Sequence, residues 1–319
     1  MPAPRVLFVK LSSLGDVVHH FPAVTDLAAH RPGARIAWAV EEAYAELVRL
    51  HPAVSEVFAV GLRGLRARVF DAARWRRAAA SRKALARDPF DFVVDTQGLV
   101  KSAVVARMAR GARFGPDRAS AREKAAAGFY DVRLAVPRDR HAVERNRLLV
   151  AQVFGYGTAG PATYGLAPPP APPAWGPASR YAVLLHAASA AAKRWPEDRW
   201  LALGQVLAQR GCTCVLPGGS DAERETAARL ASRIPGAMAA PPMGLAEAAA
   251  LLAHAACVAG VDTGLTHLAV ALGAPAAGIY VATRPELTGL HGANAVNLGG
   301  PGQAPSADDV AGVLLRALP

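Results

Sequence analysis

Short apolar runs alternate with segments of helical periodicity along the whole chain, and this alternation constrains the fold more than any other feature. The runs at 5–11, 92–95 and 181–186 are almost continuously apolar, which is typical of strands buried on both faces of a parallel sheet. A polar turn and then apolar residues at helical spacing follow each run, so the sequence predicts strand–turn–helix units. Their recurrence in both halves predicts two parallel α/β domains.

Further strands are predicted at 34–40, 57–60 and 213–217, and the last strand is predicted at 278–281. Helical periodicity continues from Val17 to about His30, and Pro22 is expected to start a new turn of that helix. Another helix is expected from 244 to 254. These elements place polar turns at the carboxyl ends of several strands, which is where open α/β sheets bind ligands.

The length and one proline-rich segment divide the chain. A sequence of 319 residues with 52% hydrophobic content can form two cores. Residues 167–177 are dominated by prolines, which exclude both helix and central strand, and they are interpreted as a semi-rigid connector. We therefore predict a first domain at 1–166, a linker at 167–177 and a second domain at 178–319, whose last helix could pack back on the first.

The positive charge is confined to the first half. Residues 1–150 contain 26 Lys and Arg against 15 Asp and Glu, whereas the remainder is balanced at 10 against 10. A basic surface attracts nucleic acid, anionic lipid headgroups or a phosphorylated substrate. Ordinary solubility charge in an arginine-rich sequence is the alternative, and confinement to one half argues against it without removing it.

Cysteines and apolar segments indicate the compartment. Cys212, Cys214 and Cys257 are unevenly spaced within apolar segments, and no disulfide or metal framework fits them, so reduced, buried thiols of a cytosolic protein are expected. No apolar run approaches the ~20 residues of a spanning helix. The first residues lead directly into a strand-like run and lack the apolar region of a signal peptide.

The stretch 258–273 contains the clearest candidate site. Its apolar run ends at Asp262, and Thr263 and Gly264 then open a helix. Backbone N–H groups at a helix N-terminus have no partner within the helix and favour negative charge, so the turn suits a phosphate. The alternative, a side chain of Asp262 or Thr263 that only caps the helix, remains open from this stretch alone.

Four segments together resemble the lipopolysaccharide heptosyltransferases, and the likeness is greatest to the heptosyltransferase I members. The segments are Lys-Leu-Ser-Ser-Leu-Gly-Asp at 10–16, Asp-Thr-Gln-Gly-Leu-Val-Lys-Ser at 95–102, Lys-Arg-Trp-Pro at 193–196 and Asp-Thr-Gly-Leu-Thr-His at 262–267. Each is weak alone, but their order and spacing cover essentially the whole chain. The resemblance implies a GT-B fold, with two Rossmann-like parallel-sheet domains facing a central cleft.

It also implies inverting transfer of L-glycero-D-manno-heptose from ADP-L-glycero-D-manno-heptose to Kdo of Kdo2-lipid A. Inversion requires a general base for the acceptor hydroxyl, and Asp16 aligns with the family's base. The leaving diphosphate requires positive charge, which Lys193 can supply as the second catalytic residue. The resemblance places the donor on Ser189, Lys193, Glu223, Met243, Asp262, Thr263, Gly264, Leu265 and His267. Without it, Met243 as core, Glu223 as a first-turn acid and His267 as a buried imidazole would be the simpler interpretations.

The acceptor carries phosphates and carboxylates, so the basic first domain is expected to bind it. The candidate acceptor residues are Ser13, Gly15, Arg63, Arg66, Arg68, Gln97, Lys101 and Arg122. The same charges predict a cytoplasmic protein associated peripherally with the anionic cytoplasmic face of the inner membrane. The sequence contains no Asp-x-Asp pair, which argues against a metal-dependent transferase, and we expect no cofactor.

The loop between Ser189 and Lys193 departs from the family. It contains Ala190, Ala191 and Ala192 where polar or acidic residues are typical, and Ala188 where threonine is common. The backbone and Lys193 remain available to the diphosphate, but the binding strength and the choice of donor are open at this loop.

The sequence leaves three alternatives to compare with this interpretation. Heptosyltransferases II and III of the same family would use a longer core acceptor. A nicotinamide-dependent oxidoreductase is disfavoured, because the first strand is not followed by Gly-x-Gly-x-x-Gly. A nucleic-acid binder is disfavoured as well, because the basic half has no interleaved aromatic stacking residues and no nucleic-acid partner is therefore expected.

Overall fold

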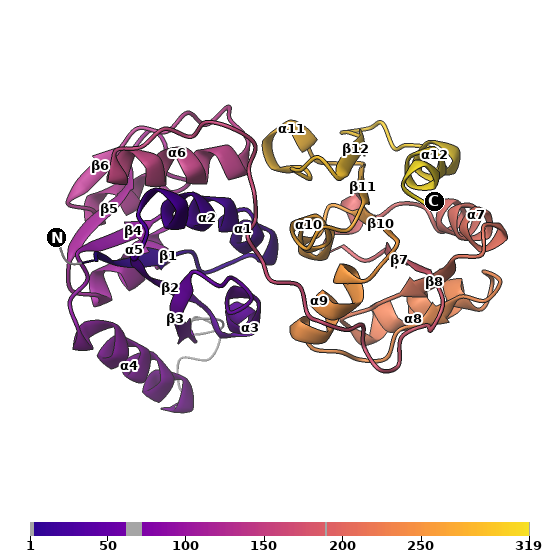
Figure 1. Ribbon diagram of the computed structural model, residues 1–319, viewed down its shortest axis with the longest axis horizontal. Coiled ribbons are helices and arrows are strands. Elements are labelled where there is room, and N and C mark those ends of the chain that lie inside the picture. Colours follow the sequence, from indigo (N-terminus) through magenta and orange to yellow (C-terminus); the bar gives the residue numbers. More distant parts are fainter. Residues whose placement is uncertain (1–2, 62–71, 189, 319) are drawn as a thin grey trace. The chain divides into compact units, whose positions relative to one another are not determined.

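The computed structural model describes residues 3–61, 72–188 and 190–318. The chain forms two compact units, Met1–Leu166 and Ala167–Pro319, and each is considered by itself (Figure 1). Within the described residues no helix is both long and apolar enough to cross a membrane.

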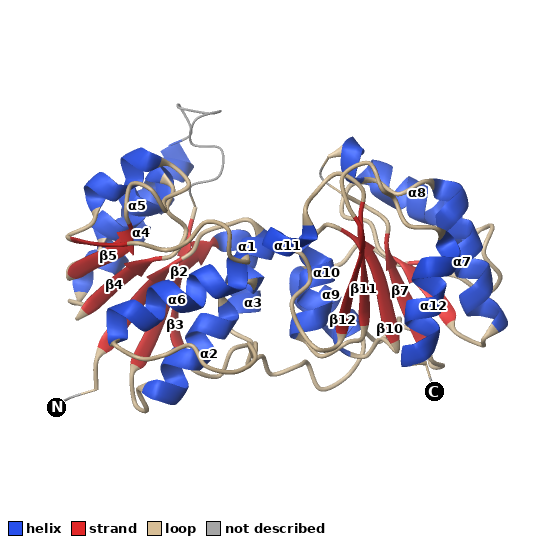
Figure 2. Cartoon of the chain, turned by 90° about the horizontal axis from the view of Figure 1, so that it is seen from above, coloured by secondary structure: helices blue, strands red, loops and turns tan. Residues whose placement is uncertain are grey.

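The first unit is built on a parallel sheet in the order β3-β2-β1-β4-β5-β6. Its strands are β1 (Arg5–Val9), β2 (Arg35–Glu41), β3 (Val54–Val60), β4 (Phe92–Asp95), β5 (Ala112–Pro116) and β6 (Val132–Leu134). Its helices are α1 (Leu14–Val18), α2 (Phe21–His30), α3 (Ala45–Val48), α4 (Ala72–Arg87), α5 (Val100–Met108) and α6 (Ala142–Phe154), with short 3₁₀ turns at Glu42–Tyr44 and Lys124–Phe129. Helices α2 and α6 pack together on one face, and α4 and α5 on the other (Figure 2).

The second unit repeats this plan with a parallel sheet in the order β12-β11-β10-β7-β8-β9. Its strands are β7 (Tyr181–Leu185), β8 (Thr213–Leu216), β9 (Met238–Ala239), β10 (Cys257–Val261), β11 (Ala276–Tyr280) and β12 (Ala295–Gly299). Its helices are α7 (Glu197–Gln209), α8 (Asp221–Ala231), α9 (Leu245–Ala253), α10 (Gly264–Ala271), α11 (Pro285–Thr288) and α12 (Ala307–Ala317), with a 3₁₀ turn at Ala191–Lys193. Helices α9 and α10 contact each other, as do α7 and α12.

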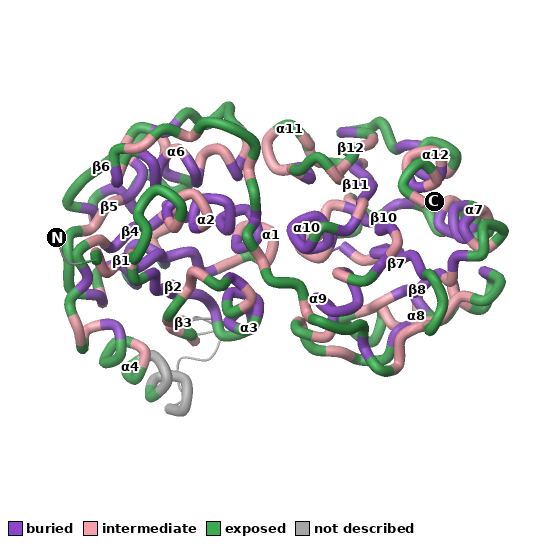
Figure 3. Tube along the Cα trace, in the orientation of Figure 1, coloured by how far each residue is buried: buried purple, intermediate pink, exposed green. Residues whose placement is uncertain are grey.

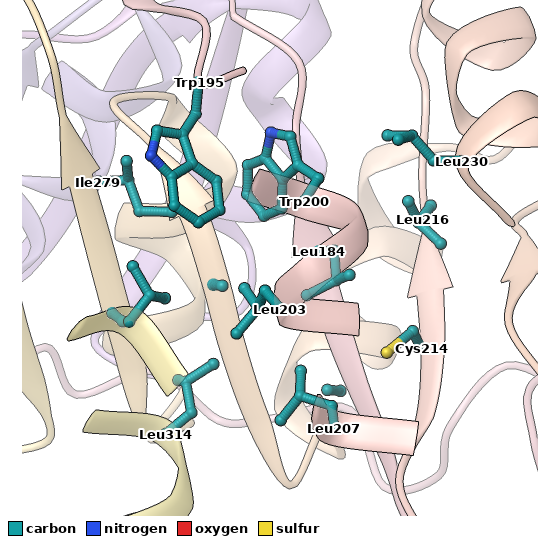
Figure 4. Packing of buried hydrophobic residues seen from close by; sticks show 14 of the residues in the cluster. Leu184, Trp195, Trp200, Leu203, Leu207, Cys214, Leu216, Leu230, Ile279 and Leu314 are labelled. Carbon is teal, nitrogen blue, oxygen red and sulfur yellow. The ribbon is translucent and has the colours of Figure 1, made fainter. Parts of the chain in front are cut away.

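The central strands of each sheet are buried on both faces, as their apolar runs predict (Figure 3). In the second unit the side chains of α7 fill the space over β7 and β10 (Figure 4). The rings of Trp195 and Trp200 meet edge to face with centroids 4.9 Å apart. Trp195 Nε1 donates to the carbonyl oxygen of Pro305 at 3.0 Å, so its one polar atom is satisfied within the core.

Both sheets reverse their strand order at one point, and these points position the candidate sites. The reversal lies between β1 and β4 in the first unit and between β7 and β10 in the second. At such a point the loops after two neighbouring strands diverge and leave a crevice at the strand carboxyl ends. The segments 10–16 and 95–102 follow β1 and β4, while 186–196 and 262–267 follow β7 and β10.

The structure differs from the sequence expectations in four strands and one helix, since β5, β6, β9 and β12 were not predicted. The strand at 278–281 is not the last, because β12 follows it at the sheet edge, where its half-exposed residues give no apolar run to detect. The helix expected from Val17 to His30 is divided into α1 and α2, with Pro22 in the first turn of α2.

The proline-rich segment is anchored to the second unit. Trp175 Nε1 donates to Glu247 Oε1 at 2.6 Å, and His254 Nε2 lies 2.9 Å from the carbonyl oxygen of Pro169, at opposite ends of α9. Helix α12 packs on α7 and on strands β10 to β12. The three cysteines are buried and free, as predicted.

Candidate functional site

Asp16 lies in the first turn of α1, where the chain turns sharply after β1. Its Oδ2 accepts hydrogen bonds from the backbone N–H and the hydroxyl of Ser13, at 3.0 and 3.3 Å. Arg122 Nη1 lies 3.2 Å from each carboxylate oxygen. The predicted residues Ser13, Asp16 and Arg122 are therefore brought together, and the carboxylate is held from two sides.

Gly98 brings Arg122 to this position. It has a φ of 65°, a left-handed conformation that glycine adopts without strain. A Cβ at Gly98 would lie 2.8 Å from Pro116 Cγ and 3.3 Å from the backbone nitrogen of Arg122, so only glycine permits the approach of the 117–123 loop. The backbone N–H of Glu123 donates to the carbonyl oxygen of Gly98 at 3.0 Å and fixes that loop next to the segment after β4.

Lys10 is a buried cation at the end of β1. Only 5% of the residue is exposed to solvent. Its Nζ donates hydrogen bonds to the carbonyl oxygen of Thr96 at 3.0 Å and to Asn146 Oδ1 at 3.2 Å. Asn146 in turn donates to the carbonyl oxygen of His19 at 2.9 Å, which fixes its amide. Burial lowers the pKa of Lys10 to about 8, against the opposing effect of Asp16 and Asp95.

These cations set the charge of Asp16. Burial by itself raises the pKa of the Asp16 carboxyl. The nearby charges of Lys10 and Arg122, together with the hydrogen bonds from Ser13 and Arg122, outweigh that effect and leave the pKa below its ordinary value. Asp16 is consequently ionised at neutral pH, which is the state a general base needs before it accepts a proton.

Gln97 and Lys101 contact the same turn through Leu11 and Ser12. The Gln97 amide accepts from the backbone N–H of Leu11 and donates to the carbonyl oxygen of Ser12, both at 2.7 Å. Lys101 Nζ donates to Ser12 Oγ at 2.6 Å and remains partly exposed. Gln97 is thus engaged in holding the turn, and its predicted contact with an acceptor stays a prediction.

A cavity opens beside Asp16 between the β1 and β4 loops and α6. Its polar lining includes Lys10, Asp16, Arg122 and Arg145. Arg145 Nε is buried and has no hydrogen-bond partner in the described part of the chain. Burial lowers the pKa of Arg145, and Arg122 and Arg138 lower it further, because like charges repel. Three cations around one carboxylate make the cavity suitable for an anionic group.

The second unit carries an ion pair at the carboxyl end of β10. Lys193 Nζ lies 2.7 Å from Asp262 Oδ2, and the Thr283 hydroxyl donates to the same oxygen at 2.9 Å. His267 Nε2 lies 3.6 Å from Asp262 Oδ1. Burial raises the pKa of Asp262, but the contacts with His267, Lys193 and Thr283 outweigh it and hold that pKa well below its usual range. Lys193, Asp262 and His267, all predicted, form one cluster.

The N-terminus of α10 lies beside this cluster. Thr263 occupies the N-cap position, but its side chain makes no capping hydrogen bond. The first turn, which begins with Gly264 and Leu265, therefore offers N–H groups to an anion. Gly260 allows the helix to approach its strand, since a Cβ there would lie 2.2 Å from Thr266 Oγ1. The sequence left two interpretations of this turn open, an anion site and a helix cap by the side chain of Asp262 or Thr263. The structure shows no such side-chain cap.

Glu223 and Met243 lie on other loops of the second unit. Glu223 Oε2 accepts from the backbone N–H groups of Gly219 and Ser220 at 2.9 and 3.0 Å and completes a capping box at α8. Met243 is half-buried in the loop before α9 and is not a core residue. Their predicted contacts with the donor stay predictions. The predicted residues Arg63, Arg66, Arg68 and Ser189 lie outside the described residues.

Sequence reasoning gave no role to three residues that the structure places in these sites. Lys10 interrupts an apolar run at a strand end, and that interruption was a usable signal. Arg145 is one cation among many in the sequence, so nothing distinguished it. Thr283 reaches Asp262 from the loop after β11, and a lone threonine 21 residues away carries no sequence signal.

Comparisons with known proteins agree with this geometry. The family model for glycosyltransferase family 9 (heptosyltransferase) matches residues 78–311. The chain is 43% identical over 301 residues to lipopolysaccharide heptosyltransferase 1 of Pseudomonas aeruginosa, covering 92% of this chain and 83% of that protein. It is also similar to Escherichia coli heptosyltransferase WaaC, solved with ADP, at a TM-score of 0.91 and 38% identity, covering 98% and 99% of the two chains.

A second structure of Escherichia coli WaaC, with ADP-2-deoxy-2-fluoro heptose, matches at a TM-score of 0.87 and 37% identity and covers 98% of this chain and 99% of that one. The expected fold, two Rossmann-like parallel sheets of the GT-B type, is confirmed by these likenesses and by the strand orders. By the family match, the identity and the coverage together, the chain belongs to glycosyltransferase family 9, the heptosyltransferases.

Proposed function

We propose that this heptosyltransferase moves L-glycero-D-manno-heptose from ADP-heptose to Kdo of Kdo2-lipid A, in the assembly of the lipopolysaccharide inner core. The observation that carries the proposal is the division of chemistry between the units. The first unit holds an ionised carboxylate among cations, and the second holds a lysine beside an uncapped helix N-terminus. A base for an anionic acceptor and a cradle for a diphosphate are the two parts that inverting sugar transfer requires.

In the proposed reaction Asp16 takes the proton of the acceptor hydroxyl. That oxygen forms the new bond to the anomeric carbon of heptose while the bond from this carbon to the diphosphate oxygen breaks on the opposite face. ADP leaves with the bonding electrons, and its developing charge is stabilised by Lys193 and the N–H groups of Gly264 and Leu265. These groups supply the positive charge that a divalent cation supplies in other transferases, so we propose that the reaction needs no metal.

Asp262 has a second role available besides the predicted contact with the donor. Two of its hydrogen-bond donors, Lys193 and Thr283, share one oxygen, so the carboxylate holds the lysine ammonium at the N-terminus of α10. A carboxylate so close to a diphosphate would repel it, and pairing with the Lys193 ammonium offsets that repulsion. The Asp262 cluster therefore orients Lys193 before the donor arrives.

The acceptor is the part of the proposal most open to test, because heptosyltransferases II and III would use a longer core. The enzyme should be incubated with ADP-heptose and either Kdo2-lipid A or Kdo2-lipid A that already carries one heptose. The product is then identified by mass spectrometry. The proposal expects addition of one heptose to Kdo2-lipid A only. Addition only to the heptose-bearing acceptor would contradict it and assign the chain to a later step.

We also propose peripheral association with the anionic cytoplasmic face of the inner membrane. The support is the excess of 11 positive charges in residues 1–150, where Arg63, Arg66 and Arg68 lie. Each Lys or Arg near an anionic surface contributes about 1 kcal/mol to binding, and salt weakens it. Flotation with vesicles containing phosphatidylglycerol should show binding at low salt that is lost at high salt. Equal binding to neutral vesicles would contradict the electrostatic origin.

A further inference from the structure

Lys10 is a charged group that the proposed reaction does not use. It is buried, and its polar contacts in the described part of the chain are both to neutral oxygens, of Thr96 and Asn146. A buried ammonium without direct contact to a carboxylate is unfavourable unless another charge compensates it. Two carboxylates act on Lys10: Asp16, which lines the same cavity and has the larger effect, and Asp95 at the end of β4.

The two cations that act on Asp16 differ in how firmly they are held. Arg122 has about half of its side chain exposed and contacts the carboxylate directly, so an anionic acceptor can compete for its guanidinium. Lys10 is enclosed and tethered by the Thr96 carbonyl and by the Asn146 amide, which is itself fixed on His19. An incoming anion can therefore withdraw Arg122 from Asp16 but cannot withdraw Lys10.

From this difference we infer that Lys10 is the fixed counter-charge of Asp16, a positioning residue that keeps the carboxylate ionised when the acceptor engages Arg122. The inference rests on the proposed role of Asp16 as the base. Lys10 touches neither substrate in this account and acts only through Asp16. Its role is distinct from that of the arginines, because it is exerted in the acceptor complex as well as in the free enzyme.

Every charged group facing Asp16 bears on the pH dependence. In the described part of the chain these include Lys10 from the turn after β1, Arg122 from the 117–123 loop and Arg145 from α6, with Asp95 at the end of β4 acting on Lys10. Lys10 and Arg122 lower the pKa of Asp16. Removal of Lys10 therefore raises that pKa, and the acid limb of the rate profile moves to higher pH. Above about pH 8 Lys10 itself loses its proton, so part of this effect disappears in the wild type as well.

The test compares the pH profile of kcat, at saturating acceptor, for wild type, Lys10→Gln, Lys10→Arg and Arg122→Gln. Glutamine keeps a donor for Thr96 and Asn146 but removes the charge. Lys10→Gln should lose roughly tenfold in kcat on the acid side of the profile and little at its plateau, whereas Lys10→Arg restores the acid side. Arg122→Gln should mainly raise the acceptor KM. An acid limb of kcat that is unmoved in Lys10→Gln would overturn the inference.

A second measurement keeps the inference testable if activity is lost. In protein labelled with ¹³C at the aspartate carboxyl carbon, the Asp16 resonance is assigned by its absence in Asp16→Asn and titrated by NMR. Its pKa should be higher in Lys10→Gln and in Lys10→Met than in wild type, whether or not either turns over; an unchanged Asp16 titration refutes the inference. If Asp16→Asn itself retained normal turnover, the proposed function of Asp16 would be wrong instead, so the two failures are distinguishable.

Discussion

Replacement of Lys193 by methionine is the change whose effect can be worked out most fully. Methionine keeps an unbranched chain of similar length and removes the charge. Two unit charges 4 Å apart interact by about 1 kcal/mol in water and about 4 kcal/mol at an effective dielectric constant of 20. The Lys193 side chain is 28% exposed, so its environment lies between these limits and nearer the second. A loss of about 2 to 4 kcal/mol of transition-state stabilisation is therefore expected.

That loss corresponds to a fall in kcat of roughly 30-fold to 1000-fold, since each 1.36 kcal/mol is about a factor of ten. The assay is steady-state release of ADP at saturating donor and acceptor, with ADP affinity measured separately by calorimetry. Lys193→Arg keeps the charge and should recover part of the rate. Arg316→Met, which removes an exposed cation from α12 of the same unit, is the matched control and should leave kcat unchanged.

The variant should fold normally, because Asp262 keeps Thr283 and His267 as neighbours after Lys193 is removed. Its thermal unfolding should therefore stay close to that of wild type. The reasoning would be refuted by a kcat within threefold of wild type in Lys193→Met with full donor saturation. It would also be refuted if Arg316→Met lost as much activity, since the effect would then come from net charge and not from position.

Three further outcomes follow from the same geometry. Arg147→Met should lower the free energy of unfolding of the first unit by roughly 3–5 kcal/mol, because it removes the buried ion-pair partner of Asp26 and Glu144. Urea unfolding measures this loss. Gly98→Ala should lower catalytic efficiency toward the acceptor and spare ADP binding, because a Cβ would displace the loop of Arg122; normal acceptor kinetics would contradict this. Reversal of Arg63, Arg66 and Arg68 to Glu should raise the acceptor KM and leave donor affinity unchanged, and a loss confined to the donor would contradict the assignment of the units.

The sequence was sufficient to predict the central strands. Residues 92–95 form β4 with the predicted bounds, and the run beginning at Tyr181 forms β7, because strands buried on both faces are apolar at nearly every position. The same rule explains the failures. Edge strands such as β12 and β6 are partly exposed, so their polar and apolar residues follow no continuous run. Their pairing is decided by neighbouring strands that lie far away in the sequence.

Candidate site residues could be predicted from the sequence where they lie together in a single turn. Asp262, Thr263 and Gly264 directly follow an apolar run, so that turn was recognisable from the residues. The turn of Asp16 also comes after a strand, but its residues alone favoured a helix cap, and the family resemblance singled it out. Contacts that join distant loops were not recognisable: Arg145 reaches the Asp16 cavity from α6, and Thr283 reaches Asp262 from the loop after β11. Lys10 lies within a recognised segment, but its burial, which determines its role, depends on Thr96 and Asn146.

The most direct test of the central claim is the release of ADP by wild type and by Asp16→Asn, with ADP-heptose and Kdo2-lipid A and with EDTA present throughout. The wild type is expected to turn over without metal. Asp16→Asn is expected to lose turnover by several orders of magnitude while its affinity for ADP-heptose, measured by calorimetry, is unchanged. Near-normal turnover by Asp16→Asn would contradict this mechanism. So would wild-type activity that is lost in EDTA and recovered when Mg²⁺ is added.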